Sequence, residues 1–462
     1  MRTLFLLAAV LSALSVTADE RPNVLFLICD DLNCDLGCYG NGVVASPNID
    51  GLAARGVRFG NTYCQYPLCG PSRASMMTGR YPDQTGIHQN AVHIRQTMPD
   101  VLTMPQAFRA AGYDAVRIGK IYHYDVPRHI GTGGHDDPYS WDRTINPEGH
   151  DTAIEDKIFT LTPGRFGGTL SWYADDAPAE EQTDGIAATE TDRVLEQYAR
   201  SGDPLFLAVG LYRPHTPFVT PEDYFNRYSP DDVVLPQVPE NYFETLPGPA
   251  VKTLTKKRHQ RNLAPELGRA ATAAYHAAIT FADAQIGRIL ESLQRHGMAD
   301  NTIVVFTSDH GYHLGPHDWY QKQTLFEDAT RVPLIFAGPG IAPERTAAGM
   351  AELVDLYPTL GTLAGIDVPA DLPGRDLSAM LRGDVAEPVR QDAFSQLLSG
   401  YSLRTPDYRL TLWGKGGVDG VELYDLASDP AEMNNLGQSE PHQSIRTRLT
   451  TRLKERIAAS GR

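Results

Sequence analysis

Strand-like apolar runs that alternate with helical patterns constrain the fold of this chain more than any other feature. The run "NVLFLIC" (residues 23–29) is almost continuously apolar, which is typical of a strand buried on both faces. This alternation predicts an α/β fold with a mainly parallel sheet covered by helices on both faces. Further strand-like runs lie at 57–64, 113–123, 204–215, 302–311 and 332–340, and helical patterns lie at 46–56, 104–112, 184–202 and 264–295.

The pattern changes near residue 385. The segments 401–416 and 421–430 are short, alternating and rich in turn residues, and an amphipathic helical pattern begins near residue 441. We therefore expect a catalytic domain over 19–385 and a smaller α+β subdomain over 386–462, built on an antiparallel sheet. The segment 125–185 is rich in Gly, Asp and Pro and has weak periodicity, which indicates a long insertion near the site.

The first residues are typical of a signal peptide. A basic start precedes the apolar run "TLFLLAAVLSALSV", and small residues lead to a predicted cleavage after Ala18, so residues 1–18 are excluded from the fold. No other stretch approaches the ~20 apolar residues of a spanning helix. No cysteine stands at the cleavage site to carry a lipid. We expect an exported protein, periplasmic or secreted, without a membrane anchor.

The balance of charge limits the class of partner. A formal net charge of −16 argues against nucleic acid. It does not exclude an anionic substrate, because a local cationic pocket can oppose the global sign. The basic run "KTLTKKRHQR" (residues 252–261) is interpreted as solvated surface in preference to a docking strip for a polyanionic glycan.

Acidic residues follow two of the buried runs at the point where each run ends. Asp30 and Asp31 follow "NVLFLIC", and Asp309 with His310 follows "TIVVFTS". Either pair alone could cap a turn. At one edge of a parallel sheet, where ligands bind, three carboxylates would repel one another unless a cation lay between them. Oxygen ligands favour calcium or magnesium, and a single imidazole offers too little nitrogen for zinc.

All five cysteines lie in the first sixth of the chain, and an odd number leaves at least one unpaired. We expect Cys29 to be an inert core residue, while Cys34, Cys38 and Cys64 could pair in ways that the sequence leaves open. Cys69 precedes "GPSR" and a helical pattern, so it lies near a helix N-terminus, where an anion is stabilised. A nucleophilic thiolate and an inert thiol are both compatible with that position.

The stretch "CGPSRASMMTGRYP", which begins at Cys69, resembles the signature of the formylglycine-dependent (type I) sulfatase family. The stretch "RPNVLFLICDDLNCDLGCYG" resembles the family's opening, and the similarity runs from about residue 21 to about residue 436. The segments "GKIYH", "YRPHTPF" and "SDHGYHLGPHDWYQKQTLFEDATRVPLI" are similar to those of the iduronate-2-sulfatase type. The similarity is weaker at 125–185, where substrate contacts are expected to vary.

The resemblance implies an alkaline-phosphatase-like α/β fold, one calcium ion, and oxidation of Cys69 to formylglycine (3-oxoalanine) by a maturation enzyme of the host. The hydrated aldehyde would attack sulfur to form a covalent sulfate ester, and its second hydroxyl would then expel sulfate. The implied metal ligands are Asp30, Asp31, Cys69, Asp309 and His310. The implied catalytic residues are Cys69, Arg73, Lys120, His123, His215 and Lys322.

The resemblance also implies a role for each catalytic side chain. Arg73 is expected to hold the hydrated aldehyde and the anion that faces the metal. Lys120 and Lys322 would bind sulfate oxygens, and His123 would accept a proton from the hydrate. His215 would meet the bridging oxygen of the ester as an acid or hydrogen-bond donor.

The sequence predicts a sulfuric ester hydrolase that acts on a sulfated carbohydrate, with a uronic acid 2-O-sulfate as one candidate substrate. His313 and His317, close to the ligand pair in the sequence, could line its pocket or entrance. Two alternatives stay open. One is a phosphate or phosphonate ester hydrolase of the same superfold, which would more often carry Ser or Thr as its nucleophile. The other is a catalytically inactive protein that binds sulfated glycans.

Overall fold

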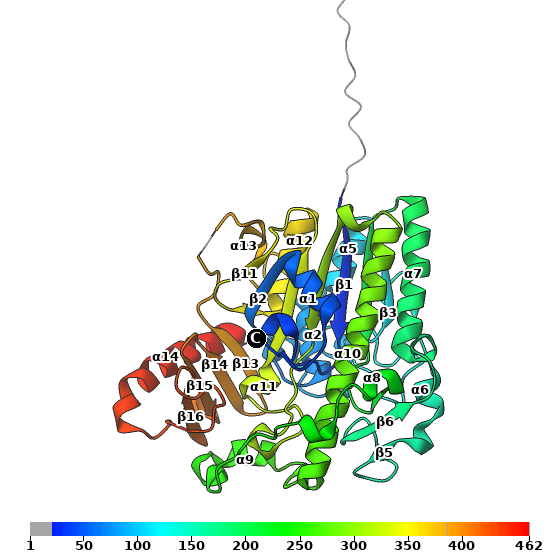
Figure 1. Ribbon diagram of the computed structural model, residues 1–462. Helices are drawn as coiled ribbons and strands as arrows, with labels where there is room; N and C mark the ends of the chain where they lie inside the picture. The colour runs from blue at the N-terminus through cyan, green and yellow to red at the C-terminus, as the bar shows by residue number, and fades with distance from the viewer. Residues whose placement is uncertain (1–20, 386, 462) are drawn as a thin grey trace, which may run out of the picture.

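The centre of the computed structural model, which describes residues 21–385 and 387–461, is a mixed and mostly parallel sheet (Figure 1). The predicted signal peptide at 1–18 lies outside the described residues. In order across the sheet, the strands are β11 (Arg345–Ala347), β2 (Gly56–Tyr63), β10 (Arg331–Ala337), β9 (Thr302–Ser308), β1 (Asn23–Cys29), β7 (Leu205–Leu211), β3 (Asp114–Gly119) and β4 (Arg143–Ile145), and β12 (Ala351–Glu352) also pairs with β2.

Strand β1 lies in the middle of this sheet and pairs in parallel with both of its neighbours. Leu25 is in register with Val304 of β9 on one side and with Leu207 of β7 on the other. Among the described strands of the sheet, β10 is the one that runs in the opposite direction, antiparallel to both β9 and β2. The prediction of a mainly parallel sheet is confirmed, and the reversal of β10 is an addition to it.

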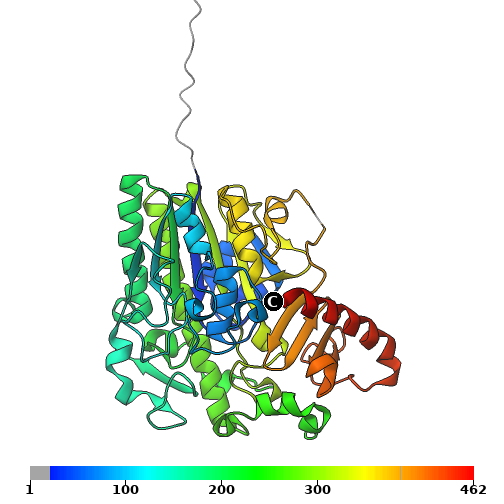
Figure 2. The ribbon, with the colours of Figure 1, turned by 180° about the vertical axis from the view of Figure 1, so that it is seen from behind.

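Helices cover both faces of the sheet, as predicted, and Figures 1 and 2 show the molecule from opposite sides. Side chains of β1 alternate between the two faces, so Leu25 and Leu27 pack in one core and Phe26 and Ile28 in the other. The first core includes side chains from α1 (Pro47–Ala54), α7 (Thr183–Ser201) and α10 (Pro265–Arg295). The second includes side chains from α2 (Cys69–Thr78), α5 (Met104–Ala110), α12 (Leu356–Ala364) and α13 (Ser378–Arg382).

A separate antiparallel sheet follows near the C-terminus, which confirms the prediction of such a sheet. Its strands are β13 (Ala393–Leu397), β14 (Gly400–Arg404), β15 (Tyr408–Trp413) and β16 (Gly420–Asp425). Helix α14 (Gln443–Ser460) packs on it through Leu449 and Leu453, beside the strands in Figure 1. The backbone N–H of Gln396 donates to the carbonyl of Gln65 at 2.9 Å, which joins this sheet to the segment after β2. The division of the chain at residue 385 into independently folding parts stays a prediction.

The remaining elements are short and lie mostly in connections between the sheet strands. A three-stranded sheet is formed by β5 (Phe159–Thr160), β6 (Ser171–Asp175) and β8 (Phe218–Pro221). It takes two strands from the predicted insertion at 125–185. The short helices are α3 (Pro82–Thr85), α4 (Ile94–Thr97), α6 (His150–Ala153), α8 (Glu222–Phe225), α9 (Gly248–Leu254) and α11 (Glu327–Thr330).

Four neighbouring parallel strands (β9, β1, β7 and β3) end at the same edge of the sheet. At this edge β3 and β7 approach each other closely where two glycines meet. A Cβ on Gly210 would lie 1.9 Å from the carbonyl oxygen of Lys120, and one on Gly119 would lie 2.2 Å from that of Gly210. The backbone N–H of Lys120 donates to the Gly210 carbonyl at 2.8 Å. The two glycines therefore allow Lys120 to begin its loop directly against β7.

We predict that Gly210→Ala lowers the free energy of unfolding by about 1–3 kcal/mol, because the added methyl group would push the β3–β7 edge apart. Urea denaturation of both proteins measures the change. Gly51→Ala is the matched control: it lies in α1 with nothing within 4 Å of the added Cβ. Removing backbone freedom there should instead raise stability by about 0.5–1 kcal/mol. A Gly210→Ala protein as stable as the parent would contradict the close packing of these strands.

Candidate active site

Five side chains from three separate parts of the chain meet at the carboxyl edge of the sheet. Their metal-ligating atoms all lie within 4.8 Å of one another, and all five residues are buried. Two of the residues follow β1, two follow β9, and the fifth is the first residue of α2. The structure thus brings together the ligand set implied by the sequence resemblance, namely Asp30, Asp31, Cys69, Asp309 and His310.

Three basic side chains hold the three carboxylates of this cluster. Arg73 Nε donates to Asp309 Oδ2 at 2.8 Å, and its Nη2 donates to Asp30 Oδ1 at 3.1 Å. Lys120 Nζ pairs with Asp30, and Lys322 Nζ pairs with Asp31 and lies 3.3 Å from Cys69 Sγ. The three basic side chains equal the three carboxylates in number. The protein itself therefore offsets the repulsion among the carboxylates.

The hydrogen bonds of Arg73 reach beyond the carboxylates of the cluster. Its Nη1 donates to the backbone carbonyls of Lys120 and Ile121, at 2.7 and 2.9 Å, and the side chain is fully buried. We expected Arg73 to hold a group on residue 69, whereas its hydrogen bonds run to Asp30, Asp309 and the end of β3. It therefore joins the ends of three strands, β9, β1 and β3.

Burial and neighbouring charges shift the pKa values of the cluster residues, upward at some residues and downward at others. Burial raises the pKa of Asp31 to about 7, although Lys322 acts to lower it. Burial also acts to raise the pKa of Asp30, but Lys120, His215 and Arg73 hold it well below its usual range. Burial would likewise raise the pKa of the Cys69 thiol, yet Lys322 and Lys120 bring about a net lowering. A negative charge on residue 69 is therefore favoured.

The cluster fits a hard divalent cation. Asp31 Oδ2 is buried and has no hydrogen-bond partner among the described residues, and His215 Nε2 lies 3.7 Å from it. His310 Nε2 lies 3.4 Å from both Asp31 Oδ1 and Asp309 Oδ2. A donor set dominated by carboxylate oxygens suits calcium or magnesium, whereas a structural zinc site draws on more nitrogen or sulfur. These residues are the ones that could hold such an ion.

Two histidines border the cluster and differ in their contacts. His215 Nδ1 lies 2.6 Å from the carbonyl of Thr216, which leaves Nε2 directed at the carboxylate of Asp31. His123 Nε2 lies 3.1 Å from Asp125 Oδ1, and its Nδ1 is buried without a hydrogen-bond partner. Burial, reinforced by Lys120, lowers the pKa of His123 to about 3. The imidazole of His123 is therefore neutral.

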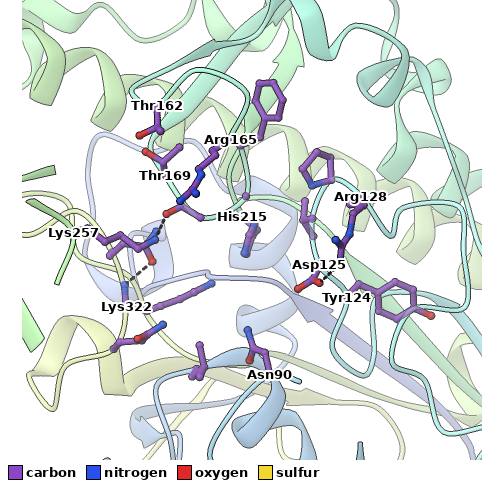
Figure 3. A pocket seen from close by; sticks show the side chains of 18 of the residues that line it. Asn90, Tyr124, Asp125, Arg128, Thr162, Arg165, Thr169, His215, Lys257 and Lys322 are labelled. Atoms are coloured by element: carbon purple, nitrogen blue, oxygen red, sulfur yellow. Dashed lines mark hydrogen bonds and ion pairs between the residues drawn. The ribbon is translucent and has the colours of Figure 1, made fainter. Parts of the chain in front are cut away.

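A pocket of about 1290 Å³ opens above the cluster, and Figure 3 shows the side chains that surround it. His123, His215 and Lys322 form part of its wall, so the pocket reaches the candidate catalytic groups. The predicted insertion contributes residues 125–128, Glu155 and residues from 162 to 169. The other lining residues are Leu68, Asn90, Tyr124, Lys256, Lys257, His259, Gln321 and Gln323.

The structure qualifies what the sequence indicated for the basic run and for two histidines. Most basic residues of the run 252–261 are exposed, in line with its interpretation as solvated surface, but its residues Lys256, Lys257 and His259 also line the pocket. His313 and His317 are fully buried away from the pocket, where they bond to Thr324 and Tyr242 respectively. The sequence carries no periodic signal for the pocket-lining positions of the basic run, because these depend on how the loop before α10 folds against the site.

All five cysteines are free thiols, and Cys29 is fully buried, as expected of a core residue. Cys34, Cys38 and Cys64 do not pair with one another. Within residues 21–385 and 387–461, no helix combines the length and apolar character needed to cross a membrane.

Comparisons with known proteins identify relatives of this chain. The family model described as "Sulfatase" matches residues 22–366, and the model "N-sulphoglucosamine sulphohydrolase, C-terminal" matches residues 315–459. Iduronate 2-sulfatase of Mus musculus is 31% identical over 96% of this chain and 95% of its own length. The Delta 4,5-hexuronate-2-O-sulfatase of Bacteroides thetaiotaomicron is 28% identical over 93% of this chain and 87% of its own.

Solved structures show the same fold. A structure described as a 2-O GAG sulfatase has a TM-score of 0.74 and 26% identity, covering 95% of this chain and 92% of its own. The phosphonate monoester hydrolase of Agrobacterium radiobacter has a TM-score of 0.80 at 23% identity, and the match covers 95% of this chain and 96% of that chain. At this identity the similarity shows the fold alone. The alkaline-phosphatase-like α/β fold implied by the sequence is confirmed.

We predict that calcium added to the metal-free protein raises its unfolding temperature, because an ion that binds only the folded state stabilises it by about 2.7 kcal/mol at a concentration 100 times its Kd. Asp309→Asn should abolish the rise, whereas Asp203→Asn, an exposed carboxylate outside the cluster, should keep it. Scanning fluorimetry with and without calcium measures the effect. An equal rise in the parent and in Asp309→Asn would contradict the site.

The same experiment has a predicted pH dependence. Burial raises the pKa of Asp31 from 3.8 to about 7, so the metal-free folded state binds a proton that the unfolded chain releases. The stability contributed by Asp31 is therefore lost as the pH rises from about 4 to 7. Calcium needs the ionised carboxylate, so its stabilising effect should grow over the same interval. A calcium effect that is constant between pH 5 and pH 8 would count against Asp31 as a ligand.

Proposed function

The chain belongs to the sulfatase family, and we propose that it hydrolyses a sulfate ester of a carbohydrate with the help of a calcium ion and a formylglycine matured from Cys69. Membership of the family makes it a sulfuric ester hydrolase. The observation that carries the rest is the convergence of Cys69, three carboxylates and three basic side chains beneath one open pocket.

The charge balance of the cluster supports an anionic substrate. Arg73, Lys120 and Lys322 already neutralise the carboxylates of Asp30, Asp31 and Asp309. A divalent ion held by these carboxylates and His310 leaves a net positive site, which suits the single negative charge of a sulfate ester. When bound, the ion supplies Lewis-acid polarisation of the sulfate oxygens.

Residue 69 is well placed to carry the nucleophile. Formylglycine supplies, through its hydrate, a hydroxyl oxygen that can attack sulfur. Cys69 begins the ten-residue helix α2, whose N-terminal dipole favours negative charge. Lys322 Nζ, 3.3 Å from Cys69 Sγ, favours it further. Lys322 and Lys120 together lower the pKa of the Cys69 thiol, against the opposite effect of burial.

The remaining side chains have roles that their contacts support. Lys120 and Lys322 can exchange part of their pairing with Asp30 and Asp31 for sulfate oxygens, since both ammonium groups border the cluster. We assign His123 as the acceptor of the proton released at residue 69 because its buried Nδ1 has no hydrogen-bond partner; its lowered pKa makes it a weak base until a bound anion favours the protonated ring. Burial keeps the pKa of His215 well below its usual range, and an arriving sulfate anion favours its protonated form, so His215 can donate to the leaving oxygen.

The named relatives of this chain indicate the class of its substrate. Relatives named for iduronate, hexuronate and N-acetylglucosamine sulfates support a sugar sulfate, and a uronic acid 2-O-sulfate is the candidate we favour. We further propose export to the periplasm or medium, guided by the N-terminal segment, and maturation of Cys69 by a formylglycine-generating or equivalent enzyme. A cysteine at the nucleophile position within the sulfatase signature favours this function over phosphate or phosphonate ester hydrolysis.

We predict that Cys69→Ser and Cys69→Ala both abolish sulfate release in a host whose maturation enzyme oxidises cysteine, because neither variant then carries the aldehyde hydrate. Ion chromatography of sulfate released from a panel of defined sugar sulfates is the measurement, and Cys38→Ser, a partly buried thiol outside the site, should keep full activity. Mass spectrometry of the peptide with Cys69 should show formylglycine in protein from a host with the maturation enzyme. An unmodified thiol in active protein, or phosphate release in place of sulfate release, would contradict the proposal.

His215→Ala should slow hydrolysis of a sugar sulfate by about 10²–10⁴-fold, the usual contribution of general acid catalysis. An aryl sulfate with an acidic phenol as leaving group needs little protonation, so its hydrolysis should fall far less. His296→Ala, before β9 at the opposite edge of the sheet, is the control. Equal losses on the two substrates would exclude His215 as the proton donor to the leaving oxygen.

A further inference from the structure

The pocket wall carries more positive charge than its own acidic residues balance. Its basic lining residues are Arg128, Arg165, Lys256, Lys257 and Lys322, of which Lys322 is already paired with Asp31, and its acidic ones are Asp125 and Glu155. Asp125 is already engaged by Arg128 at 2.8 Å and by His123 at 3.1 Å. The chain as a whole has a net charge of −16, so this wall opposes the global sign. Such a local excess attracts anions with more than one charge.

Lys257 is the most buried of the cations here that lack a carboxylate partner. It is partly buried, and its Nζ donates to the backbone carbonyl of Gly168. No carboxylate among the described residues pairs with it, whereas Lys256 on the exposed rim bonds to Gln323 at 2.9 Å. Burial, together with the charges of Lys322 and Lys256, lowers the pKa of Lys257 to about 8. A desolvated ammonium group without a counter-ion gains most when an anion arrives.

Two adjacent glycines relate Lys257 to the candidate catalytic groups. A Cβ on Gly167 would lie 3.6 Å from Cε1 of His215, and a Cβ on Gly168 would lie 3.6 Å from Nζ of Lys257. Consecutive Cα atoms are about 3.8 Å apart, so Lys257 lies across a dipeptide from His215. Figure 3 shows Lys257, His215 and Lys322 around the same cavity. Lys257 is therefore placed to meet another substituent of a sugar whose scissile sulfate lies at His215 in the same pocket.

We propose that Lys257, with Arg165 beside it in the pocket wall, binds a second anionic substituent of the substrate and makes the enzyme selective for doubly charged sugar sulfates. The substituent is a carboxylate or a second sulfate, which share the chemistry that an ammonium group recognises. This inference rests on the proposed function, because the scissile sulfate defines the first subsite. It adds a specificity-determining residue outside the cluster at the sheet edge.

The test uses pairs of substrates that differ in one charge. A hexuronic acid 2-O-sulfate is compared with its methyl ester, and a hexosamine disulfate with the corresponding monosulfate. Lys257→Met keeps an unbranched stem and removes the charge. On the doubly charged member of the pair that the enzyme accepts, kcat/KM should fall about tenfold or more, mainly through KM, which corresponds to about 1.4 kcal/mol. The singly charged member should change little, and Lys257→Arg should recover most of the loss.

Lys252→Met, an exposed lysine of α9 outside the pocket, is the matched control and should resemble the parent. Loss confined to the carboxylate pair identifies a uronic acid, and loss confined to the disulfate pair identifies a second sulfate. Equal losses on both members of every pair, or no loss on any, would overturn the role of Lys257.

A binding measurement separates this inference from the proposed function. Isothermal titration calorimetry of Cys69→Ala with the same unhydrolysed sugars should give a tenfold or greater rise in Kd on adding Lys257→Met, for the doubly charged ligand alone. If the parent releases no sulfate but this difference in Kd is found, the proposed function fails and the subsite stands. If sulfate is released and no difference in Kd is found, the subsite fails and the function stands.

Discussion

Three buried carboxylates, each held by a basic side chain at the carboxyl edge of a parallel sheet, form the interaction on which the rest of this structure depends. Arg73 lies between Asp30 and Asp309 with no exposed surface, and Lys322 bridges Asp31 and Cys69. Removing one partner of such a buried pair costs about 3–5 kcal/mol. The groups can stay buried only because β9, β1 and β3 hold them in fixed register.

The sheet and the loops contribute different parts of the site. Strand ends and the N-terminus of α2 supply the reactive cluster, which must be rigid. The pocket above it is built from loops, including parts of the 125–185 insertion and the segment before α10. Loops tolerate change more easily than strand ends do. A family that keeps one reaction and varies its sugars is expected to keep the cluster and alter residues such as Lys257.

Much of the cluster could be predicted from the sequence because it is encoded locally. Asp30 and Asp309 could be predicted because each follows a buried strand directly, whereas the role of Cys69 is implied by its resemblance to the family signature. The bounds of β1 were predicted to the residue for the same reason. The reversal of β10 and the strand β13 were not, since both depend on pairing between distant segments. Lys257 was assigned to solvated surface because a basic run looks the same whether or not a loop folds it into a pocket.

The most direct test of the central claim is anomalous X-ray scattering from crystals of the matured protein grown with calcium. We predict one calcium peak at the strand edge, about 2.3–2.6 Å from carboxylate oxygens of Asp30, Asp31 and Asp309, with the oxidised residue 69 facing it. A peak elsewhere, a zinc signal in its place, or carboxylates that turn away from a common point would contradict the account.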